Sequence, residues 1–227
     1  MNIAYRFTYQ NGRTQEIIVD VDRSAAPALA GDALPEWTLL GRQQCANCPL
    51  RAEDHPRCPA AVDLAPTMQA FAEVVSHREA RVEVTTPERT VTRRCQVQNA
   101  LSSLVALVMA TSACPILGRM RGLARTHLPF ATMEETLLRS VGAYLIKQVH
   151  VQKQGGAPDW SLTGLRAYYA ELETVNRAFK RRVEGALVQD AALNAVSALG
   201  VLSVAVAFSL EDHVAELAPY AAPSDSL

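Results

Sequence analysis

The stretch VQNALSSLVALVMATSA, residues 97–113, is uncharged and almost entirely apolar. A helix that is apolar on all sides is usually buried among other elements rather than lying on a surface. This segment therefore predicts a central buried helix, which Pro115 ends or restarts. The patterns on its two sides differ, because strand-like alternation precedes about Gln96 and helical patterns follow it.

The N-terminal residues predict a β-hairpin. Its two apolar sets occupy odd positions only, which requires a connection with an odd number of residues. The three residues Gln10-Asn11-Gly12 satisfy this, with Gly12 in the left-handed conformation of a bulge. The expected register pairs Tyr5 with Ile17 and Ile3 with Val19. The two alternating sets are Ile3, Tyr5, Phe7 and Tyr9, and Ile17, Val19 and Val21.

A second hairpin is expected further along, with strands at 80–85 and 89–94. Between the hairpins we expect a loop from Ser24 to about Leu64 and then a helix with Pro66 in its first turn. The predicted fold class is α+β, a small antiparallel sheet of two hairpins packed on a mostly helical body. We expect a single domain over 1–227, with hairpins, cysteine loop and one helix in 1–95, helical body in 96–210 and tail in 211–227.

Three further helices are predicted in the second half. Thr132 and Glu135 have the spacing of a capping box that opens a helix through His150. A break at 155–158 precedes an amphipathic helix capped by Asp159 or Ser161. The last, residues 191–210, is uncharged but rich in Ala and Ser and lacks an aromatic belt, so we expect a buried or homodimer-forming helix rather than a membrane span.

Composition restricts the possible functions. Hydrophobic residues make up 49% of the 227 residues and the net charge is −1, which argues against a protein that coats nucleic acid or an anionic membrane. The N-terminus lacks the pattern of a secretory signal, so we expect a cytoplasmic protein. Thiols stay reduced there, and the five cysteines are then metal ligands, reactive thiols or core residues.

A short proline-rich stretch, residues 45–59, contains the pattern C-x2-C-x6-H-x2-C. Pairs of ligands two residues apart recur in zinc sites, and the ligand order is that of a zinc knuckle. The stretch lacks the glycines and stacking aromatics of a nucleic-acid-binding knuckle, so no nucleic-acid partner is expected. The predicted zinc ligands are Cys45, Cys48, His55 and Cys58, with Cys114 as an alternative fourth ligand to His55.

The alternative cofactor is a [4Fe-4S] cluster held by Cys45, Cys48, Cys58 and Cys114. Three of these cysteines are followed by proline, although the spacing differs from the common ferredoxin pattern. We interpret Cys95 as a core cysteine.

Basic residues follow Cys114 closely. They could favour its thiolate or bind an anion such as phosphate or a carboxylate, or they could be a solvated basic face beside a core cysteine. We expect Cys114 and His127 to lie near the 45–58 loop. The candidate anion-binding residues are Arg119, Arg121, Arg125 and His127.

Together these motifs resemble those of an uncharacterised bacterial family, a domain of unknown function with CxxCPL…HxxCP and ATSxCP…HLPFAT motifs. The matching segments are 45–50, 55–59, 110–115 and 127–132. The resemblance extends from the first hairpin to the helix near Phe179. It implies that the cysteines of the loop, His55 and Cys114 belong together and that Cys95 does not, and it implies no reaction.

The sequence thus supports two hypotheses about function. The first is a cytoplasmic metal-binding protein whose Cys/His-rich zinc loop has a structural or regulatory role. The second is an iron–sulfur or thiol-dependent redox enzyme that acts on an anionic substrate, with an unknown small-molecule ligand.

Overall fold

One four-stranded antiparallel sheet and a set of helices make up the computed structural model, which describes residues 1–23, 34–184, 191–204 and 210. The strand order is β2-β1-β3-β4, so the two hairpins meet through β1 and β3. The predicted α+β class is confirmed. The strands are β1 (Asn2–Tyr9), β2 (Thr14–Asp20), β3 (Glu79–Thr85) and β4 (Thr90–Gln96).

The first hairpin has the register that the odd-numbered pattern predicts. Tyr5 pairs with Ile17 and Ile3 with Val19, and Gly12 has a left-handed φ of 79°. The apolar side chains of β1 therefore share one face and are buried, Tyr5 with none of its surface exposed. The opposite face is open to solvent, where Ile18 of β2 is 60% exposed. The sheet is thus covered on one side only.

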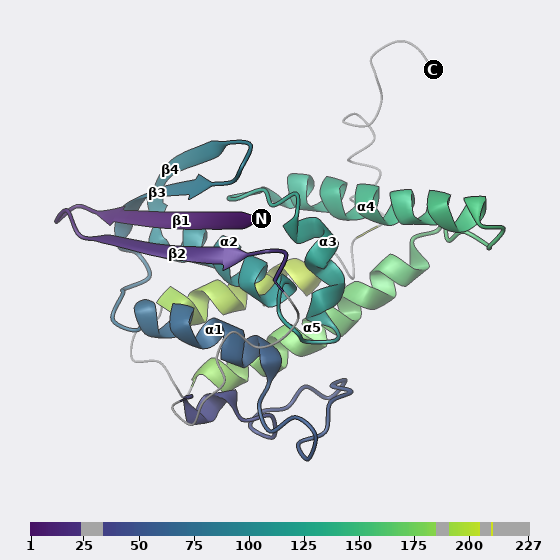
Figure 1. Cartoon of the computed structure of the whole chain (residues 1–227), viewed down its shortest axis with the longest axis horizontal. Helices are drawn as coiled ribbons and strands as arrows, with labels where there is room; N and C mark the ends of the chain where they lie inside the picture. Colours follow the sequence, from purple (N-terminus) through teal and green to yellow (C-terminus); the bar gives the residue numbers. More distant parts are fainter. Residues whose placement is uncertain (24–33, 185–190, 205–209, 211–227) are drawn as a thin grey trace, which may run out of the picture.

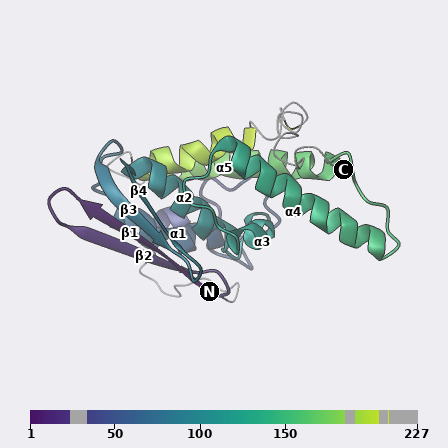
Figure 2. The ribbon, with the colours of Figure 1, turned by 90° about the horizontal axis from the view of Figure 1, so that it is seen from above.

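Helices α1 (Pro59–Ala70) and α2 (Val97–Ala110) lie beneath the sheet, and α4 (Met133–Lys153) extends away from it (Figures 1 and 2). Phe7 of β1 meets Phe71, the residue that ends α1, with ring centroids 4.8 Å apart. The remaining helices are the short α3 (Arg121–Ala124), the long α5 (Thr163–Glu184) and two 3-10 turns, η1 (Glu36–Thr38) and η2 (Leu117–Met120).

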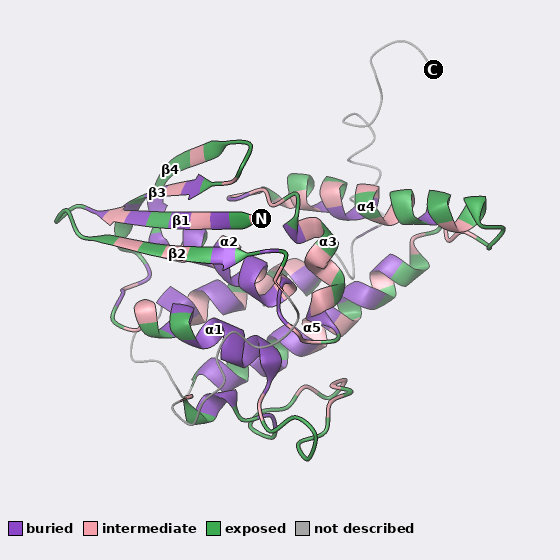
Figure 3. Cartoon of the chain, in the orientation of Figure 1, coloured by how far each residue is buried: buried purple, intermediate pink, exposed green. Residues whose placement is uncertain are grey.

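The central position predicted for the apolar helix is confirmed by burial. Most residues of α2 are buried, including Leu101 and Leu104 without any exposed surface. Figure 3 shows buried residues concentrated where α1, α2 and the sheet meet, while the far end of α4 is mostly exposed. Burial on several sides explains why α2 contains no charged residue.

The predicted boundary between loop and first helix was wrong. Helix α1 begins at Pro59, and Pro66 lies inside it rather than in its first turn. Pro59 suits the first helical position because that residue's N–H has no partner within the helix. The shift makes Cys58 the residue that caps α1. Residues 24–33 of the predicted loop lie outside the described residues.

Residues 191–204 are helical, and Ala192 and Val196 face the interior whereas Val201 is 69% exposed. Within the described part of the chain, no helix combines the length and apolar character that a bilayer crossing needs. The homodimer expected through this helix stays a prediction, and the predicted tail at 211–227 lies outside the described residues.

The capping box at the start of α4 can be tested by substitution. The Thr132 Oγ1 accepts from the Glu135 N–H at 3.2 Å, and a Glu135 carboxylate oxygen accepts from the Thr132 N–H at 2.8 Å. We expect Thr132→Ala to lower the free energy of unfolding by about 1 kcal/mol in urea titrations, because an N–H at the helix start loses its acceptor. Thr132→Ser, which keeps the hydroxyl, should stay near the parent value. Equal losses in both variants would contradict the capping role.

Candidate functional site

Four of the five cysteines line one small cavity of about 20 Å³. They come from the 45–58 segment and from the turn that follows α2, so the predicted proximity of Cys114 to the loop is confirmed. Most of the remaining wall is apolar, and Arg182 is its charged residue among those described. We call this space the cysteine cavity, and its cysteines are Cys45, Cys48, Cys58 and Cys114.

The loop that carries three of these cysteines is closed at its base by backbone bonds. Leu39 and Arg57 form an antiparallel bridge. Beside it, the Cys58 N–H donates to the Thr38 carbonyl at 2.8 Å and the Leu40 N–H donates to the Pro56 carbonyl at 3.0 Å. These bonds hold Cys58 at the mouth of the loop, where α1 begins.

A buried arginine anchors the same base from α5. Arg182 is only 2% exposed, and its guanidinium donates to the carbonyls of Trp37 at 2.9 Å and Leu40 at 3.0 Å. Among the described residues it has no carboxylate within ion-pair distance. A buried cation without an anion is unfavourable. Its position on the cavity wall therefore places an unbalanced positive charge beside the thiols.

Two Cys-Pro pairs present their sulfurs in the same way. Cys58 precedes the first turn of α1, and Cys114 precedes the turn that leads into η2. Burial raises the pKa of each thiol, and the amides of the second and third residues after each cysteine oppose that effect. Proline suits this geometry because it removes an N–H that would otherwise need an acceptor. Both sulfurs thus meet backbone groups that favour a negative charge.

The C-x2-C pair forms a turn in which the Cys48 N–H donates to the Cys45 carbonyl at 3.0 Å. Asn47, inside this turn, donates from its side chain to the Glu171 carbonyl of α5 at 3.1 Å. The loop is therefore attached to α5 at the turn as well as at its base. Burial, and then the neighbouring thiols, raise the pKa of Cys45 to about 12.

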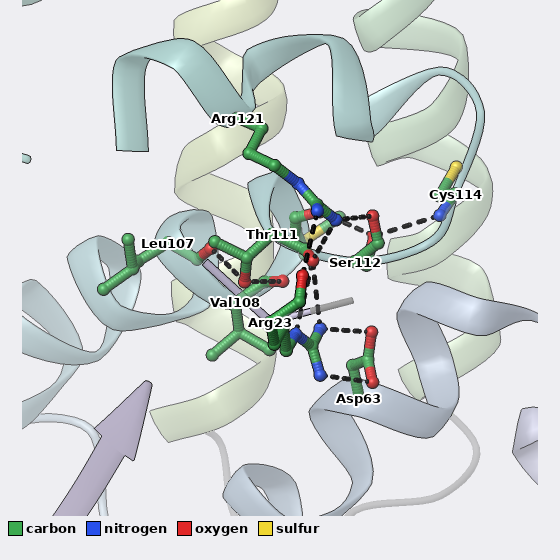
Figure 4. Close-up of polar contacts among 9 residues, drawn as sticks. Arg23, Asp63, Leu107, Val108, Thr111, Ser112, Cys114 and Arg121 are labelled. Atoms are coloured by element: carbon green, nitrogen blue, oxygen red, sulfur yellow. Dashed lines mark hydrogen bonds and ion pairs between the residues drawn. The ribbon is translucent and has the colours of Figure 1, made fainter. Parts of the chain in front are cut away.

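Two arginines fix the turn that carries Cys114 (Figure 4). Arg23 makes a two-pronged ion pair with Asp63 of α1, at 2.9 and 2.5 Å, and also donates to the Thr111 carbonyl at the end of α2. Arg121 donates to the same carbonyl at 2.7 Å. The Cys114 N–H then bonds the Ser112 hydroxyl in that turn. We call Arg23, Asp63, Thr111 and Arg121 the arginine clamp.

His55 does not join the cysteines in this structure. Its side chain is exposed in the loop and is not part of the cavity wall. Across the described residues, no three His, Cys, Asp or Glu side chains converge closely enough to hold one metal ion as they stand. Cys95, which we interpreted as a core cysteine, is buried in β4, away from the cysteine cavity.

The predicted anion-binding residues have separate partners. Arg119 lies over the Tyr168 ring at 3.9 Å and pairs with Glu171 at 2.8 Å. Arg125 pairs with Asp22 at 2.7 Å, and Arg121 belongs to the clamp. His127, the fourth candidate, lines a different cavity and not the cysteine cavity. Its expected place near the 45–58 loop stays a prediction. Anion binding by the three arginines stays a prediction.

A second, larger cavity of about 370 Å³ lies between α2, α4, α5 and residues 198–203. We call it the large cavity. His127 lines it and bonds Tyr5 of the sheet, Nε2 to Oη, at 2.6 Å. Phe130 also lines it, in a left-handed conformation with φ of 62° that is strained for an aromatic residue. Leu117 lines both cavities. The sequence analysis did not predict the large cavity. The HLPFAT motif around His127 was the one local pattern that pointed to this region.

The arginine clamp predicts a large stability loss on substitution. Asp63→Ala leaves the half-buried Arg23 guanidinium without its anion, and we expect the free energy of unfolding to fall by about 3–5 kcal/mol. Asp54→Ala is the control, because its partner Arg51 is 76% exposed and the expected change is about 0–1 kcal/mol. Similar values for both variants, measured by urea unfolding, would show that the clamp contributes little.

His127 predicts a pH-dependent stability. Burial, and then Arg139, lower its pKa from 6.5 to about 4. Between these values the unfolded chain binds a proton that the folded chain does not, so stability falls as pH is lowered through this window. The His127 contribution is on the order of 3 kcal/mol. His127→Gln should flatten the difference in urea midpoint between pH 7 and pH 4.5, and an unchanged difference would contradict the assignment.

Comparisons with known proteins place the chain in a family. Residues 3–221 match the family described as a domain of unknown function, DUF6901. No curated protein and no solved structure matches the chain. The matched region contains both hairpins, the cysteine cavity and the large cavity. The chain therefore belongs to the DUF6901 family.

Proposed function

We propose that the chain is a cytoplasmic metal-binding protein in which a zinc ion fastens the 45–58 loop to the helical body. The proposal rests on one observation above all, the four cysteines from separate segments that line a single small cavity. The proposed ligands are Cys45, Cys48, Cys58 and Cys114. His55, the other candidate for the fourth position, is exposed in the loop and is not part of this wall.

The surroundings of the thiols favour a closed, structural site over a catalytic one. Structural zinc sites are typically four-coordinate with thiolate and imidazole ligands and leave no position for water or substrate. The cavity has room for about one water-sized sphere, and most of its wall is apolar. Arg182 and the amides after Cys58 and Cys114 would balance part of the negative charge of a tetrathiolate site.

The loop also needs a fastening that its own side chains do not supply. Residues 51–56 are all exposed, so little apolar burial holds that part of the loop in place. Metal binding contributes directly to folding free energy when ligands come from segments distant in sequence. On this proposal the ion links the start of α1, the turn after α2 and the C-x2-C turn. The protein's task would then be interaction or regulation.

A [4Fe-4S] cluster on the same four cysteines is the second candidate. The side chains do not converge on one point as they stand, and a cluster's four thiolates bind different iron atoms and need not do so. This candidate would make the chain a redox protein. Its proposed anionic substrate would require an arginine to leave its present partner.

The location and partners follow the same chemistry. Four reduced thiols require a reducing compartment, which supports the cytoplasm. We keep the homodimer through the C-terminal apolar helix as a proposal, supported by the exposed Val201 and Val204. The net charge of −1 supports the absence of nucleic-acid or membrane partners.

Metal analysis of the untagged protein, purified without air, tests the proposal. We expect about one zinc per chain and no colour. Cys114→Ser should lose most of the zinc and lower the thermal midpoint, because a ligand and its link to the loop are removed. Cys95→Ser is the matched control for a cysteine outside the cavity, and His55→Ala is the control for the histidine. Both should keep their zinc.

Other results would choose between the candidates or reject both. About four irons per chain with broad absorption near 400 nm would identify the cofactor as the cluster rather than zinc. Zinc loss in His55→Ala but not in Cys114→Ser would overturn the four-cysteine ligand set. Less than about half an equivalent of either metal would contradict both candidates.

A further inference from the structure

The large cavity has the size and wall of a small-molecule site. Its volume of about 370 Å³ lies within the range of about 300–1,000 Å³ typical of such sites. Leucines make up much of the wall, with three methionines among them, and one side chain, Arg139 of α4, carries a charge at neutral pH. No carboxylate is among the described residues of the wall.

Arg139 is only partly used by the protein. One of its terminal nitrogens donates to the carbonyls of Leu123 at 2.9 Å and Thr126 at 2.7 Å. The other two guanidinium nitrogens have no bonding partner among the described residues, and the side chain makes no ion pair there. Glu135, one turn earlier on α4, is used by the capping box. Arg139 therefore offers free donors, and its positive charge is compensated only in part by Glu135 on the same helix.

His127 is a second polar side chain of the same wall. Near it, the Phe130 N–H donates to the Ser103 hydroxyl at 3.3 Å. Burial raises the pKa of Tyr5, and that of His127 is lowered to about 4, so both groups are neutral near pH 7. The Tyr5 hydroxyl and His127 Nε2 share one hydrogen bond at 2.6 Å. Nδ1 of His127 has no hydrogen-bond partner among the described residues.

We propose that the large cavity binds an aliphatic monocarboxylate, whose carboxylate pairs with Arg139. Arg139 and His127 both line this cavity. The terminal nitrogen of Arg139 that has no partner can donate a charge-assisted hydrogen bond to a carboxylate. The apolar remainder of the ligand lies along the leucines.

The composition of the wall favours a flexible aliphatic chain over a planar aromatic one. Met109, Met120 and Met133 adapt to the shape of a ligand. Phe130 and Tyr169 are the aromatic rings of the described wall apart from His127, and Tyr169 already bonds Ser140 at 2.6 Å. None of the four clustered cysteines lines this cavity, so the proposal is independent of the metal centre.

Calorimetric titration of the full chain with decanoate, kept below its micelle concentration, tests the proposal, with 1-decanol as the uncharged probe. We expect saturable binding of decanoate at one site and binding of decanol weaker by about tenfold or more, the worth of a charge-assisted bond. Arg139→Gln should reduce this preference to about twofold or less, and Arg139→Lys should restore part of it. Arg177→Gln, on an exposed arginine of α5, should leave it unchanged.

Three results would overturn the proposal. One is the absence of saturable decanoate binding. The second is equal binding of decanoate and decanol to the parent protein. The third is a preference that survives in Arg139→Gln. Thermal unfolding of each variant without ligand identifies a folding defect. If Arg139→Gln does not fold, the preference for decanoate is compared between Arg139→Lys and the parent protein instead. Because these readouts use no cysteine, failure of this test and failure of the metal analysis are separate outcomes.

Discussion

The geometry of the cysteine cavity depends on one buried ion pair. Arg23 and Asp63 join the end of the N-terminal hairpin to α1, and Arg23 reaches across to the last carbonyl groups of α2. Arg121 adds a second positive charge there, where a helix leaves carbonyls without partners and its dipole favours cations. Asp63 lies five residues after Cys58, and Thr111 lies three residues before Cys114. The clamp thereby determines how far apart two of the thiols from distant segments sit.

Several arginines among the described residues donate to backbone carbonyls rather than to carboxylates. Arg182 donates to loop carbonyls, Arg121 to a helix end and Arg139 to the turn before α4. Such contacts leave the net charge of each arginine uncancelled in a partly buried setting. Two of these cations lie on the walls of the two cavities. Among the described residues, each of the two cavities thus has one arginine in its wall that makes no ion pair.

Sequence patterns predicted a structural feature correctly where the residues that determine it are close together in the chain. The parity of the apolar residues set the hairpin register, and Thr132 with Glu135 marked the start of α4, because both signals are complete within one element. The start of α1 was misplaced because two prolines suited a helix start and only tertiary contacts choose between them. The clamp pairs residues 40 positions apart, and no periodicity encodes such a contact. The same holds for Arg139, whose bonds to Leu123 and Thr126 lie 16 and 13 positions away.

The shared wall of the two cavities has a thermodynamic consequence. Leu117 faces both spaces, and packed side chains occupy discrete rotamers rather than a continuous range. A guest that selects one Leu117 rotamer in the first space changes the room left in the second. Linkage then requires the influence to be reciprocal, with each guest altering the affinity for the other by the same factor. One leucine side chain would thus set the sign of cooperativity between two chemically unrelated guests.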